Sequence, residues 1–391
     1  MEMPRAVAVY GLAFRRENSM MKQAILTLLG LAIVGALSGS PVQPQGETER
    51  LMEKADAVLV ASAQSGWRTG NSVSLWLLVA RSIKGPLNRG DVVKVSWATA
   101  VRSFAEVKGQ YGIWFLRTDQ EGDWTLLSIT NSRVPLQAAF FELSGSAVPI
   151  PPIDQSAPGT ASDLVAEELG AALPYYKGPL QLHLLATGLR GIANSSSPHR
   201  IYESLRSSSD AELKFIALAG LISEGDRTAL AEVSEDISAA ADLTVGGAFV
   251  ADAVRSLRDS DSGTVLALGK IASSRSDQLR SSAAQALAYI HTRETMPFLA
   301  QLLDAPDAGS RQSAMLGMSR FVCNLPVATE QATVTGRDLV PQGPAPYRTR
   351  ATDDHSLATR QLDANKEAEY LGFWRAWWDA SRQTVMGGDR R

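Results

Sequence analysis

The chain has 391 residues, of which 45% are hydrophobic and 20% are charged, as is typical of a globular protein. This length is enough for about two domains with additional tails. The formal net charge of −3 gives no overall reason to expect a nucleic acid or an anionic membrane surface as a partner.

Residues 1–40 have the form of an N-terminal extension that ends in a signal peptide. A positive charge at Lys22 precedes an apolar run from Ala24 to Leu37, and small residues follow at positions 38–40. The run is too short to span a bilayer comfortably, and cleavage after Ser38 satisfies the rule for small residues at the cleavage site. We therefore predict an exported protein, periplasmic or extracellular. The alternative is an uncleaved segment that anchors the protein to a membrane.

Residues 50–145 predict a small β-domain, because apolar residues alternate there with period two. The alternating or continuous apolar runs are 57–61, 73–79, 93–97, 112–116 and 124–129, and residues such as Gly85 and Pro86 form turns between them. About five strands in so short a segment favour a closed barrel or a sandwich, since closure removes exposed edges.

Three motifs of this segment resemble the netrin-like or TIMP-like OB-fold domains of exported bacterial proteins. They are Ala55-Asp56-Ala57-Val58, then Ile83-Lys84-Gly85, then Tyr111-Gly112-Ile113-Trp114-Phe115-Leu116. The resemblance implies an OB-like β-barrel. Metalloprotease inhibitors of that family chelate the zinc of their target through an N-terminal cysteine. This chain has no cysteine there, so that inhibitory mechanism is not implied.

The aromatic and basic residues of the β-domain allow two interpretations. They form a ligand-binding face as in other OB-folds, or some pack in the core and the others are scattered over the surface. They are Trp67, Arg68, Trp76, Trp97, Arg102, Phe104 and Trp114. Core packing is favoured, because Trp97 lies on the apolar face of its strand and Trp114 lies within an apolar run. Trp76 points away from Leu75 and Leu77, which makes it the candidate for an exposed aromatic residue that contacts a partner.

Residues 146–160 are rich in Pro, Gly and Ser and predict a linker, after which Ser162 and Asp163 can cap a first helix. Residues 161–325 predict an array of paired helices. One pattern recurs there, as Lys214-x-x-Ala217-x-x-Gly220-Leu221, Arg280-x-x-Ala283-x-x-Ala286-Leu287 and Arg311-x-x-Ala314-x-x-Gly317-Met318. The last two copies are 31 residues apart and the first two are 66 apart, with a weak copy between them. A helical period of this length indicates a repeat array.

The recurring residues have physical roles in such an array. The small residues allow neighbouring helices to approach closely. Asp210, Asp277 and Asp307 precede the second helix of each pair, where a carboxylate can cap the backbone. The cation of each copy is a candidate partner for those aspartates.

The repeated pattern resembles HEAT repeats of the short bacterial kind, which implies an α-solenoid that binds partners. The predicted fold is therefore a multidomain α and β protein, a small OB-like β-barrel followed by an α-solenoid of HEAT-like repeats.

Residues 326–356 predict a loop, and residues 357–386 predict a Trp-rich helix with Trp374, Trp377 and Trp378. This helix docks on a membrane or a partner, or it folds back as a cap over the last repeat. The cap is favoured because three exposed tryptophans would promote aggregation. The three tryptophans join Trp76 as the possible interaction surface.

The sequence predicts no catalytic residue, cofactor or metal site. Its histidines, His183, His199, His291 and His355, do not have the spacing of zinc ligands. Asp259-Ser-Asp261-Ser-Gly263 begins like a calcium loop, but Lys270 stands where that loop needs a glutamate. Cys323, the single cysteine, follows an apolar helical run and predicts a buried thiol.

We therefore expect a non-catalytic exported scaffold or binding protein, which mediates protein–protein interaction through its HEAT-like array. The partner is expected to be a protein and not a nucleic acid, and the mature form is expected to have no integral membrane span. Two alternatives stay open. One is a hydrolase or hydrolase regulator with a site in the interdomain cleft, and the other is a membrane-associated envelope scaffold.

Overall fold

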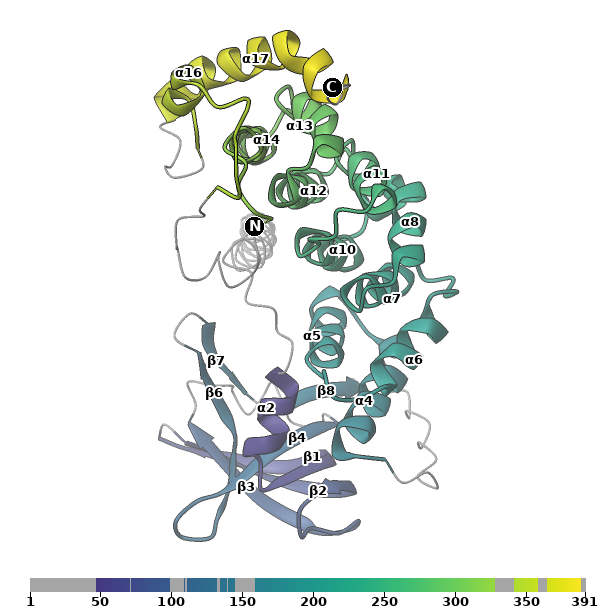
Figure 1. Cartoon of the computed structure of the whole chain (residues 1–391). Helices are drawn as coiled ribbons and strands as arrows, with labels where there is room; N and C mark the ends of the chain where they lie inside the picture. The colour runs from purple at the N-terminus through teal and green to yellow at the C-terminus, as the bar shows by residue number, and fades with distance from the viewer. Residues whose placement is uncertain are drawn as a thin grey trace, which may run out of the picture. The chain divides into compact units, whose positions relative to one another are not determined.

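The computed structural model describes residues 47–70, 72–98, 109, 111–131, 134–138, 140–144, 159–327, 341–357 and 364–387 (Figure 1). Every described residue belongs to one compact unit, Pro44–Arg391. The predicted signal peptide, most of the predicted linker, Arg102 and Phe104 lie outside the described residues.

Five strands close into a barrel: β1 (Ala57–Thr69), β2 (Ser72–Lys84), β3 (Val92–Ala98), β4 (Tyr111–Thr118) and β5 (Trp124–Leu126). Their order is β1-β2-β3-β5-β4, and β4 pairs back with β1 to complete the ring. Only the β3–β5 pair of this ring is parallel. β8 (Phe140–Ser144) extends the sheet beside β4, and β6 (Ser128–Asn131) pairs with β7 (Val134–Ala138) in a separate hairpin. The predicted small OB-like barrel is confirmed.

The first half of β1, from Ala57 to Ala63, and most of β4 are buried on both faces. Leu59 and Trp114 point into the barrel core, whereas Val60 and Phe115 belong to a second core that the barrel shares with the helices. The indole of Trp114 donates a hydrogen bond to the Ala61 carbonyl over 3.0 Å. Double burial explains why these strands have continuous apolar runs, while the neighbouring β2 alternates.

A helix that the sequence analysis did not predict, α2 (Glu47–Lys54), precedes the barrel and contacts both domains. The Thr48 hydroxyl donates to the carbonyl of Gly188 over 2.8 Å. The Lys84 ammonium, on β2, donates to the carbonyls of Met52 and Ala55 at 2.6 Å each. A cation at these carbonyls satisfies the helix end and favours its dipole.

The chain from 161 to 322 is helical, as predicted. Its α-helices are α4 (Ala161–Ala172), α5 (Pro179–Arg190), α6 (Ser197–Leu205), α7 (Ala211–Ser223), α8 (Arg227–Glu235), α9 (Ile237–Ala240), α10 (Val245–Arg255), α11 (Ser262–Ile271), α12 (Asp277–Ile290), α13 (Met296–Leu302) and α14 (Ala308–Val322). We name α7, α10, α12 and α14 the central row, because each packs against the next (Figure 1). Helices α6, α8, α11 and α13 pack beside members of this row, so each apolar stripe is buried between neighbours.

The three copies of the repeated pattern lie on α7, α12 and α14, and α10 occupies the place of the weak copy. Their small residues stand at close contacts. A Cβ atom at Gly220 would lie 2.4 Å from the ring of Tyr202 on α6, and one at Gly317 would lie 2.7 Å from Leu299 on α13. The small residues therefore allow each helix to approach its paired helix.

Two of the three aspartates expected to cap helices do so. Asp210 accepts hydrogen bonds from the amides of Glu212 and Leu213 at the start of α7. Asp307 accepts from the Ser310 amide at 2.7 Å. For α12 the expectation was wrong, because Ser276 is the N-cap and Asp277 is already the first helical residue.

The cations of the repeated pattern reach forward along the array. Lys214 lies 2.9 Å from Asp236, in the turn after α8, and so does not pair with Asp210 as expected. Arg280 pairs with Asp307 of the next helix pair at 2.6 Å. The Arg280 guanidinium also contacts Asp277 and donates to the Ser274 carbonyl over 2.8 Å.

The last cation of the pattern, Arg311, continues this arrangement. It pairs at 2.8 Å with Glu367, at the start of α17 (Glu367–Gly387), and also donates to the Ala305 carbonyl. Each cation thus ties its own turn to a later segment.

The segment predicted as a loop between the array and α17 contains a short helix, α16 (Arg350–Asp354). Tyr347 of this segment stacks on Phe321 of α14, with ring centroids 5.5 Å apart. Helix α17 packs against α13 and α14. Within the described part of the chain, no helix has the length and apolar character needed to cross a membrane.

The close contact at Gly220 can be tested by stability. We expect Gly220→Ala to lower the free energy of unfolding by about 1–3 kcal/mol, since the added methyl group must displace the Tyr202 ring. The matched control is Gly372→Ala on α17, where nothing lies within 4 Å of the new Cβ. This control should be neutral or stabilising by up to about 1 kcal/mol. Urea unfolding of both variants measures the difference, and equal effects would contradict the packing.

Candidate functional site

The barrel carries an exposed apolar surface on the outer face of β1, β2 and β3. We name it the outer barrel patch, and its residues are Trp67, Trp76, Leu78, Val92 and Lys94. Strand register places Lys94 opposite Trp76 and Val92 opposite Leu78. The exposed fractions are 44% for Trp67, 38% for Leu78 and 58% for Val92.

The two tryptophans of the patch contact each other. Their ring centroids are 6.3 Å apart and their planes are tilted by 49°. The Lys94 ammonium lies 5.9 Å from the centre of the Trp67 ring, where a cation is attracted to the aromatic face. The patch therefore combines apolar area with one positive charge at its edge, an arrangement suited to binding a partner.

Trp76 was the sequence candidate on this surface, and the structure places it there, half-buried against Trp67. Leu78 and Val92 were not among the residues predicted from the sequence. Leu78 could have been predicted from the sequence. Side chains alternate along a strand, so position 78 points outward when Leu75 and Leu77 point inward. Trp97 and Trp114 are buried in the barrel core, as favoured from their strands.

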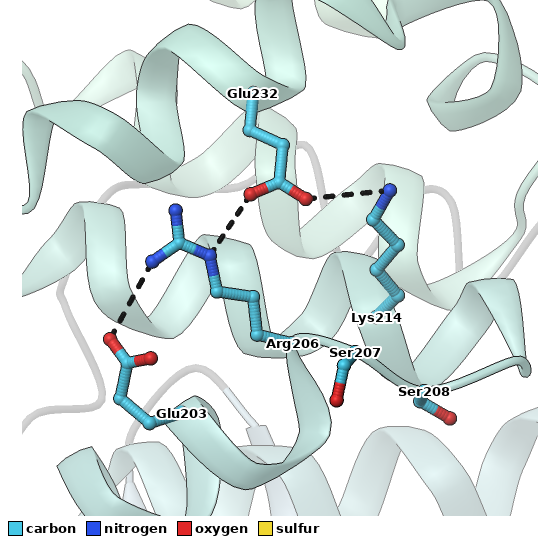
Figure 2. Close-up of a pocket in the computed structure, with 6 residues that line it drawn as sticks. All are labelled: Glu203, Arg206, Ser207, Ser208, Lys214 and Glu232. Carbon is cyan, nitrogen blue, oxygen red and sulfur yellow. Dashed lines mark hydrogen bonds and ion pairs between the residues drawn. The ribbon is translucent and has the colours of Figure 1, made fainter.

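The helical domain has a hollow of about 460 Å³ (Figure 2). Its lining residues are Glu203, Arg206, Ser207, Ser208, Lys214 and Glu232. Glu232 of α8 bridges two cations, since it accepts from Arg206 Nε at 2.9 Å and lies 3.4 Å from Lys214 Nζ. Three helices contribute these charges, so no local pattern in the sequence could indicate the hollow.

The charges of this hollow are mutually compensated. Hydrogen bonding to Glu232 raises the pKa of Arg206, and hydrogen bonding to Asp236 raises the pKa of Lys214. Both groups therefore stay positively charged, and neither can act as a general base. The Ser208 hydroxyl accepts a hydrogen bond from the Asp210 amide. This geometry forms a charged surface network and not a nucleophile activated by a base.

A buried ion pair joins the barrel to the array. Arg81 of β2 lies 2.5 Å from Glu168 of α4, whose side chain is only 1% exposed. Burial raises the pKa of Glu168, although the Arg81 charge opposes the shift. Burial and then the Glu168 charge raise the pKa of Tyr111 nearby. The hydrolase alternative needs a carboxylate of this kind in an open cleft, whereas Glu168 is enclosed and paired.

The histidines have separate local partners: His183 faces Phe249, His199 pairs with Glu224, His291 contacts the Leu325 carbonyl and His355 stacks on Phe373. Burial lowers the pKa of His183 and of His291. Over the part of the chain that the structure describes, no group of three or more His, Cys, Asp or Glu could hold a metal ion. Cys323 is buried as predicted, and burial raises the pKa of its thiol.

The tryptophans of α17 differ in their environments. Trp374 has no exposed surface, and its indole donates to the His355 carbonyl over 3.1 Å. Trp378 is 8% exposed. Trp377 is half-buried and packs edge-on against Tyr347. Of this part of the predicted interaction surface, Trp377 is the most accessible tryptophan.

Comparison with known proteins adds no family to this description. No protein-family model matches the chain, and no curated protein matches it. The outer barrel patch is the candidate binding site because it is where large apolar side chains gather on an accessible face.

The Arg81–Glu168 pair predicts an asymmetric response to mutation. Arg81→Met should lower the free energy of unfolding by about 3–5 kcal/mol, because Glu168 would stay buried without its partner. The double variant Arg81→Met/Glu168→Leu should recover most of this loss, since it removes both buried charges. Urea unfolding measures both variants. A double variant as unstable as the single one would show that the charge is not the cause.

The raised pKa of Glu168 also predicts a pH dependence. Because the pKa of Glu168 in the folded protein lies above the ordinary value of 4.5, the folded protein holds this proton more tightly than the unfolded chain does. The resulting stabilisation is complete below the unfolded pKa and is lost as the pH rises through the folded pKa. Wild type should therefore lose stability relative to Glu168→Gln as the pH rises from 4.5. Unfolding curves for both proteins across this range give the difference, and parallel pH profiles would contradict it.

Proposed function

We propose that this protein is a non-catalytic exported scaffold, which uses its barrel and helical array to hold a protein partner. The observation that carries the proposal is the outer barrel patch. Monomeric proteins rarely expose contiguous apolar patches larger than a few hundred Å², and such patches mark interaction sites. Here Trp67, Leu78 and Val92 are each more than a third exposed and lie on one face of three neighbouring strands.

The array supports a scaffold role for a second reason. In its central row each helix packs on the next, and cations such as Arg280 and Arg311 link successive segments. Stacked helical pairs of this kind present extended surfaces for protein partners. We assign the helices to HEAT-like repeats of the short bacterial kind, on the strength of the recurring Ala and Gly positions and the capping residues.

For the barrel, the strand order and the three sequence motifs support a netrin-like or TIMP-like OB domain. The joint with the array supports a combined binding unit, because α2 and the Arg81–Glu168 pair contact both domains. Export is proposed from the form of residues 20–40, which resembles a cleaved signal peptide.

The patch can be tested by site-specific photo-crosslinking in the native envelope. A photoreactive phenylalanine at Val92 of the full chain should give one defined adduct with a protein. The matched control places the same group at Leu266 of α11, which is 55% exposed and lies away from the barrel strands. The control should give no such adduct.

The second part of this test removes the Trp67 side chain from the patch. Trp67→Ala should weaken the complex by about 2 kcal/mol or more, roughly thirtyfold in Kd, if the ring is a central contact. The affinity is measured with the captured partner after its purification. A Val92 adduct that forms equally well in the Trp67→Ala background would overturn the assignment of the patch.

A further inference from the structure

The second half of β1 is paired on one side only among the described residues. Its register with β2 continues to Thr69, at the end of the strand. Its register with β4 ends at Ser62, and the next carbonyl, that of Ala63, accepts a hydrogen bond from the Gly109 amide. From 65 to 69, no described residue pairs with the side of β1 that faces away from β2. We name residues 65–69 the β1 edge.

The backbone of the β1 edge is suited to pairing with another strand. In an antiparallel pair, every second residue turns its N–H and C=O away from the partner strand. A row of such groups is a template for one more strand, and proteins usually cover or shorten it. All side chains of the β1 edge are exposed, and only Gly66 is half-buried, so a partner can reach this row.

The two faces of the β1 edge carry different side chains. Trp67 contacts Trp76 and so lies on the outer face, within the outer barrel patch. Arg68 pairs with Val73, whose side chain belongs to the barrel core, so Arg68 lies on the opposite face. A strand added to this edge therefore meets an aromatic ring on one face and a guanidinium on the other.

The charges beside the β1 edge are positive. Arg68 Nε donates to the Gly70 carbonyl over 3.1 Å, and the Lys94 ammonium lies above the Trp67 ring. Within the described ranges, no carboxylate forms an ion pair with either cation. Because side chains alternate along a strand, a segment that places acidic residues beside Arg68 places the residues between them beside Trp67.

We propose that the partner binds through an extended segment of alternating apolar and acidic residues, which adds to the barrel sheet along the β1 edge. Its apolar side chains pack on Trp67, and its carboxylates face Arg68. In this mode of recognition, main-chain hydrogen bonds give affinity and alternate side chains give specificity. This mode of binding rests on the proposed function, since it names the chemistry of the partner at the same patch.

The first test titrates the full chain with labelled peptides and measures fluorescence anisotropy. A peptide of alternating valine and glutamate should bind about tenfold or more tightly than one of alternating valine and lysine. The net charge of −3 of the chain opposes this preference, so non-specific attraction would not produce it. Arg68→Glu should reverse the preference. Equal affinities, or a preference that Arg68→Glu leaves unchanged, would overturn the proposal.

The matched control is Arg89→Glu. It makes the same change of charge at an exposed residue of the barrel, in the turn at the other end of β2. This variant should keep the preference for the glutamate peptide. Loss of the preference in Arg89→Glu would show that the charge of the whole domain, and not Arg68, selects the peptide.

Hydrogen exchange of the full chain tests the main-chain pairing. In the chain alone, the amides of 65–69 that face away from β2 should exchange fast. The valine–glutamate peptide at saturation should slow them by about tenfold or more, because an added strand bonds them. Slow exchange without the peptide would show that the chain itself or a second copy covers the edge. Either that result or binding without protection of 65–69 would overturn the proposal.

Crosslinking at Val92 then separates this proposal from the proposed function. The Val92 adduct should be lost in Arg68→Glu, as it is expected to be in Trp67→Ala. An adduct that needs Trp67 but persists in Arg68→Glu would keep the proposed function and overturn strand addition. The absence of any adduct in the unmodified background would overturn both.

Discussion

The rest of the structure depends on the need to bury both faces of two barrel strands, β1 and β4. The apolar residues of these strands point to both faces of the sheet. A closed barrel covers only the inward set, which includes Leu59 and Trp114. The outward set, which includes Val60 and Phe115, would face water without the helices. Burial of apolar area is the largest favourable term in folding, so this outer face requires a cover. Helices α2, α4 and α5 supply it, and the barrel and the start of the array share one core.

Polar contacts then define how this shared core is assembled. Arg81 and Glu168 bring opposite charges into the joint, where an uncompensated charge would be costly. Thr48 and Lys84 satisfy carbonyl groups at helix ends. Hydrophobic contact alone is not directional, whereas these contacts have strict geometry. The joint thereby gains a specific arrangement as well as a favourable free energy.

Further along the chain, the need to bury apolar surface recurs in each helix pair of the array. Each helix pair has an apolar stripe that only its neighbours can bury, so stability comes from stacking. Arg280 and Arg311 add a directional link at each step. Against this background the outer barrel patch stands out, because Val92 and Trp67 place apolar area in water without any cover from the described residues.

The sequence by itself determined the local features of the fold. Period-two alternation at Val73 to Val79 indicated a strand, and the recurring Ala and Gly positions indicated stacked helices, because these patterns depend on the geometry of one element. The helix caps at Asp210 and Asp307 could also be predicted, because a cap depends only on residues close to it in the sequence. The boundary at α12 was missed because Ser276 and Asp277 are adjacent and both can cap a helix.

Only the tertiary structure decided which distant groups meet. Glu168 lies on α4, and nothing near it in the sequence marks Arg81 of β2 as its partner. The partners of Lys214 and Arg311 were likewise beyond local reasoning, since they lie 22 and 56 residues away. The contact of Trp67 with Trp76 depends on the register of two paired strands. Side-chain pairing across elements is set by how the elements pack, and a single sequence carries no direct record of that packing.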